Sequence, residues 1–364
     1  MSFLKCLPAV YVIGDEYEVA LTLSDFGVVE LHVGQEVFFE ENTGVLPTER
    51  SYARIRLPQS VLDGAKAYTV VFRKTMERKS YWSTLGEPER EEFTFKPIEK
   101  TENVNIYYIS DVHYHFESAK KIASYFGDDT DLYVFCGDIG EVQTEEDYFE
   151  VCRLVGEVSR GSIPVVFVRG NHDTRGHLPE KYTDYFPANN KDTFFTLKVG
   201  PITAVALDLG EDKPDGHTVY GGYNRFHAFR LREDRFLKAL RDRGEKFTLA
   251  ISHIAPAYTA ATSDSEFNIE GELYERWNGM LSELGVRAML TGHIHEAFIL
   301  DKNDGRSLRP HDFPIIVGSK TADDYLLGTA LTLSGDRLTV RFTYADRSVI
   351  EEYEITLSAG EVRK

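Results

Sequence analysis

Cysteine is scarce in this chain of 364 residues, which contains only Cys6, Cys136 and Cys152. None of them has the close pairwise spacing of a zinc site, and an odd number argues against a framework of disulfide bonds. This composition excludes a small disulfide-stabilised secreted domain and fits a reducing compartment. We therefore expect a cytoplasmic protein.

Long apolar runs and runs of basic residues are also lacking. No segment reaches the ~20 apolar residues of a membrane-spanning helix, and the apolar opening is interrupted by Lys5 and Pro8 and has no small-residue cleavage site. The chain carries 41 lysines and arginines against 59 aspartates and glutamates, a formal net charge of −18. Because nucleic-acid backbones bind clustered cations, we expect neither a membrane nor a nucleic acid as a partner.

Short β-rich segments fill the first part of the chain, where helical periodicity is absent. A length of 364 residues predicts about two domains, and the polar segment at residues 96–103 predicts the boundary between them. We predict a small all-β domain over residues 1–98, similar to an immunoglobulin or fibronectin type III sandwich, and a second domain over residues 99–364. The predicted strands of the first domain are residues 17–23, 28–33, 36–40, 52–57, 67–73 and 93–95.

After the boundary, apolar strand-like segments alternate with helical patterns, which predicts a layered α/β domain. The predicted strands are residues 106–109, 132–136, 164–168, 202–207, 247–251, 288–290 and 315–317, and the predicted helices are residues 117–125, 145–158, 233–240 and 271–284. Three closing β segments without helices between them, residues 330–333, 338–344 and 350–357, predict hairpins that complete the sheets.

The strand predicted at residues 106–109 ends at an acid and a histidine. Asp111 and His113 are two residues apart, so in an extended chain their side chains leave the same face and suit two ligands of one metal ion. Taken alone, Asp-x-His is a common turn after a strand. Four later strands, however, also end in residues that can bind metals: Gly137-Asp138, Asn171-His172-Asp173, His253, and the pair His293 and His295. Because ligands of α/β sheets gather beyond the carboxyl ends of strands, we expect these side chains to meet.

This order of five blocks resembles the calcineurin-like metallophosphoesterase superfamily over roughly residues 104–320. The resemblance implies a layered α/β/β/α sandwich, in which two facing sheets are flanked by helices, and a binuclear metal centre. One metal would be held by Asp111, His113 and His295, the other by Asn171, His253 and His293, and Asp138 would bridge them. Oxygen and imidazole ligands without a thiolate suit two divalent transition metal ions such as Mn, Fe, Zn or Co, and do not select among them.

The residues around Asp138 and Asn171 distinguish branches of this superfamily. Purple acid phosphatases have a metal-binding tyrosine where this chain has Glu141, and Ser/Thr protein phosphatases have an arginine after their acid that is missing here. In the family the histidine at the position of His172 faces the leaving group, so we predict His172 and Glu141 as catalytic residues, with Glu141 orienting the imidazole. An exposed loop acid is the alternative for Glu141. Asp173 is predicted as a hydrogen-bond acceptor that supports the ligands.

Two further elements are predicted to lie near substrate. Arg175 follows in the same loop and is predicted to bind the substrate phosphate, although a solvated loop residue is the alternative. The aromatic, glycine-rich stretch at residues 209–232 is predicted either to form a wall of the substrate site or to pack within the fold.

The resemblance implies hydrolysis of a phosphoric mono- or diester by attack of a hydroxide that bridges two divalent metals, with a small phosphorylated molecule as substrate. The Asp-x-His and Gly-Asn-His-Asp blocks also resemble the cyclic nucleotide phosphodiesterase branch, which is the narrower alternative. From a different class, the alternative is a non-catalytic interaction protein with a vestigial metal site. These motifs specify neither the substrate, nor the native metals, nor the oligomeric state.

Overall fold

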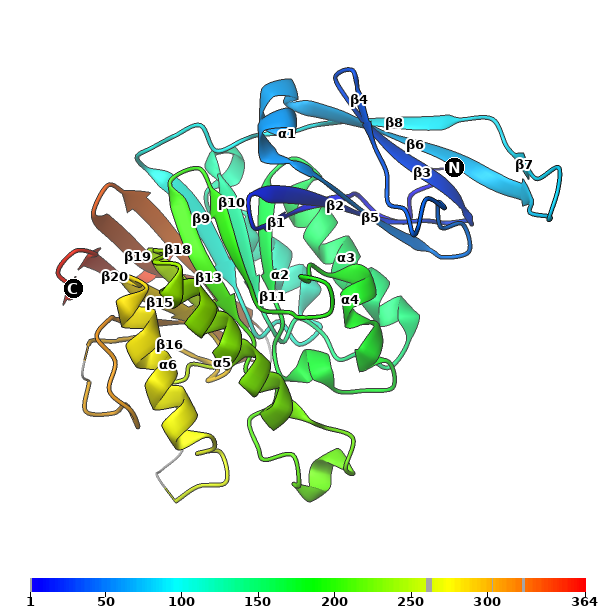
Figure 1. Cartoon of the computed structure of the whole chain (residues 1–364). Helices are drawn as coiled ribbons and strands as arrows, with labels where there is room; N and C mark the ends of the chain where they lie inside the picture. The colour runs from blue at the N-terminus through cyan, green and yellow to red at the C-terminus, as the bar shows by residue number, and fades with distance from the viewer. Residues whose placement is uncertain (1, 260–263, 303, 323–324) are drawn as a thin grey trace.

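The computed structural model describes residues 2–259, 264–302, 304–322 and 325–364. Two β-sheets lie at its centre (Figure 1). The first contains β9 (Val104–Ile109), β10 (Leu132–Cys136), β11 (Pro164–Val168), β18 (Tyr325–Ser334), β19 (Arg337–Thr343), β20 (Val349–Thr356) and β21 (Glu361–Arg363). The second contains β12 (Phe195–Val199), β13 (Ile202–Leu207), β14 (Leu249–Ser252), β15 (Ala288–Thr291), β16 (Glu296–Leu300) and β17 (Ile315–Ala322). The pairing of β17 with β18 joins the two sheets along one edge.

Helices cover the outer faces of both sheets. On the first lie α2 (Phe116–Ala123), α3 (Glu145–Ser159) and α4 (Tyr182–Tyr185), and on the second lie α5 (Phe226–Asp242) and α6 (Gly271–Glu283). Short 3-10 turns occur at η1 (Gly127–Asp129), η2 (His172–Thr174), η3 (Pro179–Lys181) and η4 (Thr218–Tyr220). Among the described residues, no helix is both long and apolar enough to cross a bilayer.

The alternation of side chains along β10 shows how the layers form. Leu132, Val134 and Cys136 point into the core between the two sheets, whereas Tyr133 and Phe135 point toward the helices. A strand buried on both faces in this way is apolar throughout, which is why the sequence at β10 has no polar alternation. The predicted α/β/β/α layering is therefore confirmed.

The chain before residue 98 forms antiparallel β-structure, as predicted. One layer consists of β1 (Ala9–Ile13), β2 (Glu16–Thr22) and β5 (Tyr52–Pro58). The other consists of β3 (Gly27–Val33), β4 (Glu36–Phe38), β6 (Ala67–Glu77), β7 (Thr84–Leu85) and β8 (Glu89–Thr94), and α1 (Gln59–Ala65) connects β5 to β6. The sequence patterns did not predict β1 or α1. Helix α1 buries only Leu62 and therefore lacks the apolar stripe that marks a helix in a sequence.

The first of these strands belongs to the central sheet. β1 runs parallel to β11, with Val10 opposite Pro164 and Tyr11 opposite Val165. The layer of β1, β2 and β5 thus extends the first sheet across the predicted boundary at residue 98. The division into domains 1–98 and 99–364 stays a prediction, and any division there has to cut a continuous sheet.

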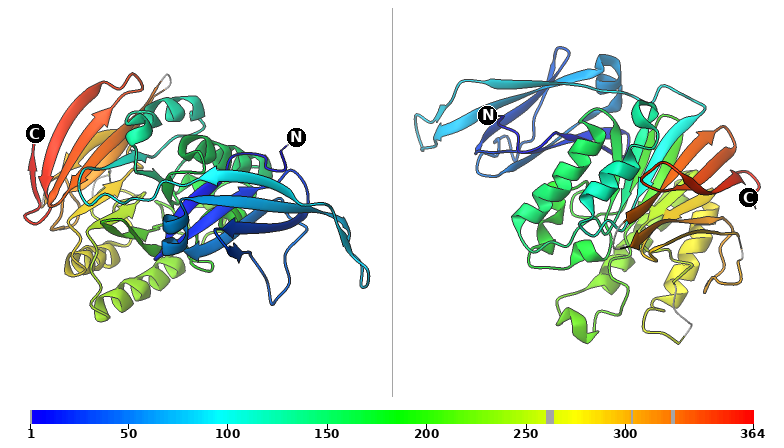
Figure 2. Two further views of the ribbon diagram at one scale, coloured as in Figure 1. Left: turned by 90° about the horizontal axis from the view of Figure 1, so that it is seen from above. Right: turned by 180° about the vertical axis from the view of Figure 1, so that it is seen from behind.

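One part of the N-terminal region stands away from the body. Tyr68, Val70 and Phe72 in the first half of β6 are buried, but none of residues 73–90 is. Residues 73–90, which we call the arm, form a ribbon of β6 and β7 that projects from the side of the molecule in Figure 1 and in both views of Figure 2.

Candidate metal centre

The structure brings all seven predicted metal ligands together beyond the carboxyl ends of β9, β10, β11, β14 and β15. They form two groups. The outer cluster is Asp111, His113 and His295, whose ligand atoms lie within 4.8 Å of one another. The inner cluster is Asp138, His253 and His293, which meet the same criterion, together with Asn171 beside them.

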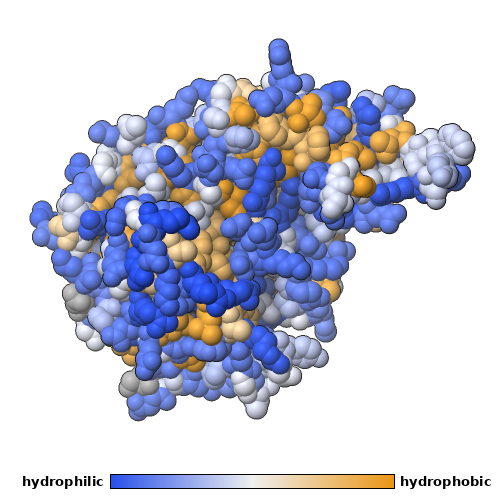
Figure 3. Space-filling model, viewed as in Figure 1, coloured by the Kyte–Doolittle hydropathy of each residue, from blue (hydrophilic) through white to orange (hydrophobic). Residues whose placement is uncertain are grey.

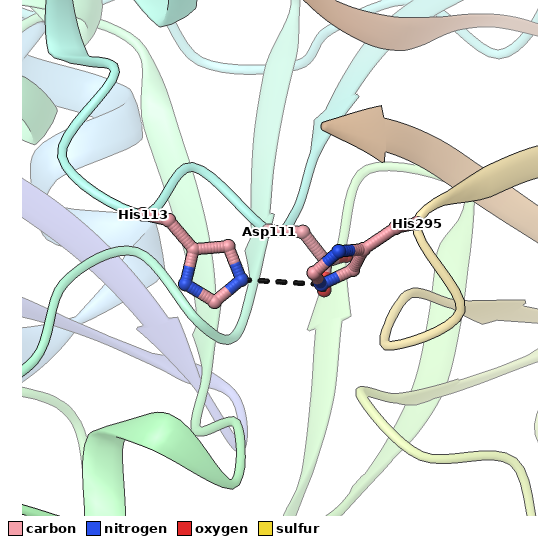
Figure 4. A group of neighbouring side chains, drawn as sticks. All are labelled: Asp111, His113 and His295. Carbon is pink, nitrogen blue, oxygen red and sulfur yellow. Dashed lines mark hydrogen bonds and ion pairs between the residues drawn. The ribbon is translucent and has the colours of Figure 1, made fainter. Parts of the chain in front are cut away.

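In the outer cluster two imidazoles face one carboxylate (Figure 4). His113 Nε2 lies 3.2 Å from His295 Nε2, and His295 Nε2 lies 3.3 Å from Asp111 Oδ1. His295 is half exposed, with 43% of its side chain accessible. The cluster is therefore open on the side of His295.

The inner cluster is more enclosed. His253 Nε2 lies 3.0 Å from Asp138 Oδ2, and only 2% of the His253 side chain is accessible. The amide oxygen of Asn171 lies 3.0 Å from His293 Nδ1 and 3.2 Å from both His253 Nε2 and Asp138 Oδ2. When the facing nitrogens of His253 and His293 carry no proton, four atoms with lone pairs thus face one another.

The backbone at these ligands is unusual. Asp111, His113, Asp138, His293 and His295 all have positive φ angles, between 42° and 70°. Side-chain-bearing residues rarely adopt this left-handed conformation, and strain of this kind concentrates at functional sites. The sharp turns bring ligands from separate strand ends to one point.

Glycines next to the ligands allow this convergence. Gly137, at φ 77°, lies so close to the next loop that a Cβ there would be 2.5 Å from Gly170 Cα and 2.6 Å from His253 Cγ. A Cβ on Gly292 would be 2.5 Å from Asp111 Oδ2. The glycines of the Gly-Asp and Gly-His blocks are therefore required by close packing.

Hydrogen bonds fix the orientation of the ligands. The Nδ1–H of His253 donates to the Cys136 carbonyl at 2.7 Å, which directs Nε2 toward the inner cluster. Asp111 Oδ2 accepts bonds from Ser319 Oγ at 2.6 Å and from the His293 amide at 3.0 Å. Asp173 Oδ2 accepts bonds from the amides of Gly170 at 2.7 Å and Asp138 at 3.1 Å, in agreement with its predicted role as an acceptor.

Electrostatic interactions within the inner cluster are strong. Burial acts to lower the pKa of His253, but the carboxylates of Asp138 and Asp111 outweigh it and raise the pKa to about 10. Burial and the nearby His253 lower the pKa of His293 to about 4. Burial acts to raise the pKa of Asp138, but His253 lowers it to about 2. Two buried carboxylates are thus balanced by one cationic imidazole, and more positive charge would be favourable here.

The donor set fits divalent transition metals. The four imidazoles, two carboxylates and one amide oxygen include no thiolate, a combination that suits Mn, Fe, Zn or Co. The Asn171 oxygen provides the most direct test, because it faces Asp138 Oδ2 and the nitrogens of His253 and His293, which accept and do not donate when they carry no proton there. A cation among these atoms would satisfy all four, whereas without one the amide would turn its NH₂ group inward.

The two predicted catalytic residues form a pair beside the outer cluster. The His172 Nδ1–H faces Glu141 Oε1 at 2.8 Å, and the His172 ring centroid lies 4.8 Å from that of His113. His172 also anchors the inner cluster, since its backbone amide donates to Asp138 Oδ1 at 2.8 Å.

Arg175 is held next to this pair. Its Nη1 lies 3.0 Å from His172 Nε2, while Nε and Nη2 donate to the two carboxylate oxygens of Glu211, each at 2.7 Å. Glu211 is buried. The guanidinium of Arg175 is therefore held beside His172 by a buried acid, and its role toward a substrate stays a prediction.

Glu211 and Asp212 are the site residues that sequence reasoning missed. Asp212 Oδ2 lies 3.8 Å from His293 Nε2, and the Tyr220 hydroxyl donates to Glu211 Oε2 at 3.0 Å. These acids follow β13, another strand that ends at the same edge, but Asp208, Leu209 and Gly210 separate them from its end. Tyr220 belongs to the stretch predicted as a substrate wall, and it reaches the acids of the site, whereas Tyr223 is exposed.

Comparisons with known proteins agree with this geometry. A family model described as calcineurin-like phosphoesterase matches residues 104–297, more than half of the chain. Over 229 residues the chain is 24% identical to a Bos taurus protein named serine/threonine-protein phosphatase CPPED1, a match that covers 59% of this chain and 68% of that protein.

Two solved structures are similar along almost the whole chain. The purple acid phosphatase PPD1 from yellow lupin (Lupinus luteus) has a TM-score of 0.59 at 13% identity, and the match covers 96% of this chain and 74% of that one. PhoD has a TM-score of 0.57 at 12% identity, with 100% and 93% covered. At these identities the likeness concerns the fold alone.

Proposed function

Because the chain belongs to the calcineurin-like phosphoesterase family, we propose that it hydrolyses a phosphoric mono- or diester with the help of two divalent transition metal ions. The observation that carries this proposal is the meeting of seven oxygen and nitrogen ligands from five strand ends in two adjoining clusters. A site that had lost its function would be expected to have lost ligands, and the sequence retains all seven predicted ones.

The outer cluster would hold one ion and the inner cluster the other, with Asp138 between them. Asp138 Oδ2 lies 3.0 Å from His253 Nε2 and 4.0 Å from His113 Nε2, so it reaches both clusters. When bound, two such ions neutralise phosphoryl oxygens and lower the pKa of the attacking water. The protein holds these ligands with the hydrogen bonds described above.

His172 is proposed to assist the leaving group. Glu141 accepts the Nδ1 proton at 2.8 Å, which fixes the ring and leaves Nε2 as the atom that exchanges a proton with substrate. Arg175 Nη1 currently lies against that Nε2 at 3.0 Å. A phosphoryl oxygen bound here would compete with His172 for the Arg175 donor, so Arg175 would contact the substrate while Glu211 keeps its guanidinium in place.

The test combines metal analysis with three substrates. Purified protein is loaded with Mn, Fe or Zn, its metal content is counted, and it is assayed with an aryl phosphate monoester, a bis-aryl phosphate diester and a phosphoserine peptide. The peptide is included because the bovine relative is named a serine/threonine-protein phosphatase. We expect about two metals per chain and metal-dependent hydrolysis of at least one substrate.

Asp128→Asn, a change at an exposed acid, provides the control variant and is expected to behave as the parent chain. Less than one metal per chain together with no hydrolysis of any substrate would overturn the proposal and favour an interaction protein with a vestigial site.

A further inference from the structure

The arm, residues 73–90, has no core of its own. Each of its residues is exposed or half exposed. At its base Lys74 pairs with Gly27 of β3 and its carbonyl accepts a hydrogen bond from the Gly86 amide, and beyond the base the two strands pair through Thr75 with Leu85 and Glu77 with Thr84. An isolated two-stranded ribbon is marginally stable in water. Packing within the molecule therefore does not explain why the arm projects into solvent. Binding to another surface would explain it.

The end of the arm carries large aromatic side chains in solvent. Trp82 is 87% exposed and Tyr81 is 73% exposed, and their ring centroids lie 5.8 Å apart. Met76 and Leu85 on the same ribbon are exposed as well. In Figure 3 the arm ends in pale side chains of intermediate hydropathy, beyond the blue surface that covers most of the body. The tip is convex, so it suits a soft surface better than it suits a groove.

The charge of the arm is opposite to that of the molecule. Five cations, Arg73, Lys74, Arg78, Lys79 and Arg90, stand against three acids within residues 73–90, although the whole chain has a net charge of −18. Lys79 pairs with Glu77 and Lys74 pairs with Asp25. The Arg78 guanidinium donates a hydrogen bond to the neutral hydroxyl of Thr48, which does not compensate its charge.

We propose that the arm binds the surface of a lipid bilayer with anionic headgroups, inserting Tyr81 and Trp82 at the boundary between headgroups and acyl chains. Tyrosine and tryptophan favour this boundary, because each has an apolar ring and a polar atom. Arg78 and Lys79 directly precede the aromatic tip, where long cationic side chains reach anionic headgroups while their stems cover apolar surface. Such binding needs no membrane-spanning helix, and it does not depend on the activity proposed above.

Tryptophan fluorescence offers a direct test, because the chain has only two tryptophans. Trp277 is fully buried in α6, so a change in emission on mixing with vesicles reports on Trp82. Full-length protein is mixed with vesicles of phosphatidylcholine alone or with added phosphatidylglycerol, and binding is measured by co-sedimentation. We expect a blue shift and co-sedimentation with the anionic vesicles, and much weaker binding to phosphatidylcholine alone.

Three variants separate insertion from other kinds of binding. Tyr81→Ser with Trp82→Ser should abolish co-sedimentation. Arg78→Gln with Lys79→Gln should weaken it by roughly tenfold or more, because each cation near an anionic surface adds several-fold to the affinity. Phe39→Ser changes another exposed aromatic residue of the same region and should leave binding unchanged. Far-UV circular dichroism and thermal unfolding should be the same in all variants, which shows that they fold without relying on the activity proposed above.

Several outcomes would overturn the proposal. The first is the absence of vesicle binding. The second is binding that persists in the double serine variant, which would show electrostatic adsorption alone. The third is a blue shift of Trp82 emission that depends on protein concentration in the absence of lipid. The last result would assign the arm to contact between copies of this chain, and sedimentation equilibrium would detect it.

Discussion

The two metal clusters are made of similar residues in different surroundings. In the inner cluster His253 is buried and its second nitrogen donates to a backbone carbonyl, whereas in the outer cluster His295 is 43% accessible. Buried charges interact through a low dielectric and lose little to screening. The inner cluster is therefore expected to bind its ion more tightly than the outer cluster, whose ion should exchange faster with solvent.

Asp138 joins the clusters, so its replacement should have the largest effect. Asp138→Asn is expected to lower the metal content at both clusters. Loss of a residue that only hydrogen-bonds a ligand typically reduces activity by about 10- to 100-fold, and the loss of turnover in Asp138→Asn should be larger. Metal content by mass spectrometry and initial rates measure the two effects. Retention of both metals would show that Asp138 does not serve both clusters.

A smaller loss is expected from Glu141→Gln, which leaves both clusters intact but weakens the orientation of His172. Turnover should fall by about 10- to 100-fold with metal content unchanged. Glu180→Gln, at an exposed acid of a neighbouring turn, serves as the matched control. Because Glu141 also lies within ligand distance of His113 and His172, a loss of metal in Glu141→Gln would instead make it a ligand.

Staged removal of metal should expose the contrast between the clusters directly. In dilute chelator the loaded protein is expected to lose about one equivalent quickly and the second slowly, because the outer cluster is open to solvent. His295→Ala should retain the slow equivalent, whereas His253→Ala should not. Simultaneous loss of both ions from the parent chain would contradict the comparison.

The smallest expected effect is on the pH dependence of the thermal stability of the metal-free protein. The pKa of His253 is raised to about 10, above its ordinary value of ~6.5, so its stabilising charge is complete below about pH 6.5 and is lost as pH rises toward 10. The pKa of Asp138 is lowered to about 2, so its contribution is complete above about pH 4 and is lost in stronger acid. His293 acts in the opposite sense, because its pKa is lowered to about 4 and the unfolded chain takes up this proton first as pH falls below about 6.5. Thermal stability should therefore be highest near pH 6.5 and should fall on both sides of it.

On the alkaline side the melting temperature is expected to fall by a few degrees, since 1 kcal/mol corresponds to roughly 2–4 °C in chains of 150–250 residues. His253→Gln should remove most of this alkaline dependence, and loading with metal should do the same, because an ion takes the place of the proton. An alkaline slope that is unchanged in His253→Gln would assign it to other groups.

Strand ends made the candidate site visible in the sequence. Each of the five strand ends is followed by a ligand within three positions, and the fold places such positions at one edge. Glu211 and Asp212 escaped notice because Asp208, Leu209 and Gly210 separate them from β13, so no strand end marked them. Their role comes from contacts with Arg175 and His293 across the site, which no local pattern records.

The boundaries of helices and strands also depend on contacts that are distant in the sequence. The helix predicted at residues 233–240 begins at Phe226, because Asp215 accepts hydrogen bonds from the amides of Phe226 and His227. A cap supplied by a residue 11 positions earlier leaves no signal in the helix itself. In the same way β1 is specified by its partner β11, which is far away in the sequence.

The parallel pairing of β1 with β11 has a consequence for biosynthesis. Val10 leaves the ribosome long before Pro164, its partner across the sheet, and at typical rates of 5–20 residues per second the interval is about 8 to 30 s. During that time β1 can pair with β2 but not with its other neighbour, which leaves one apolar edge open. This edge is the place where a nascent chain would need protection by a chaperone.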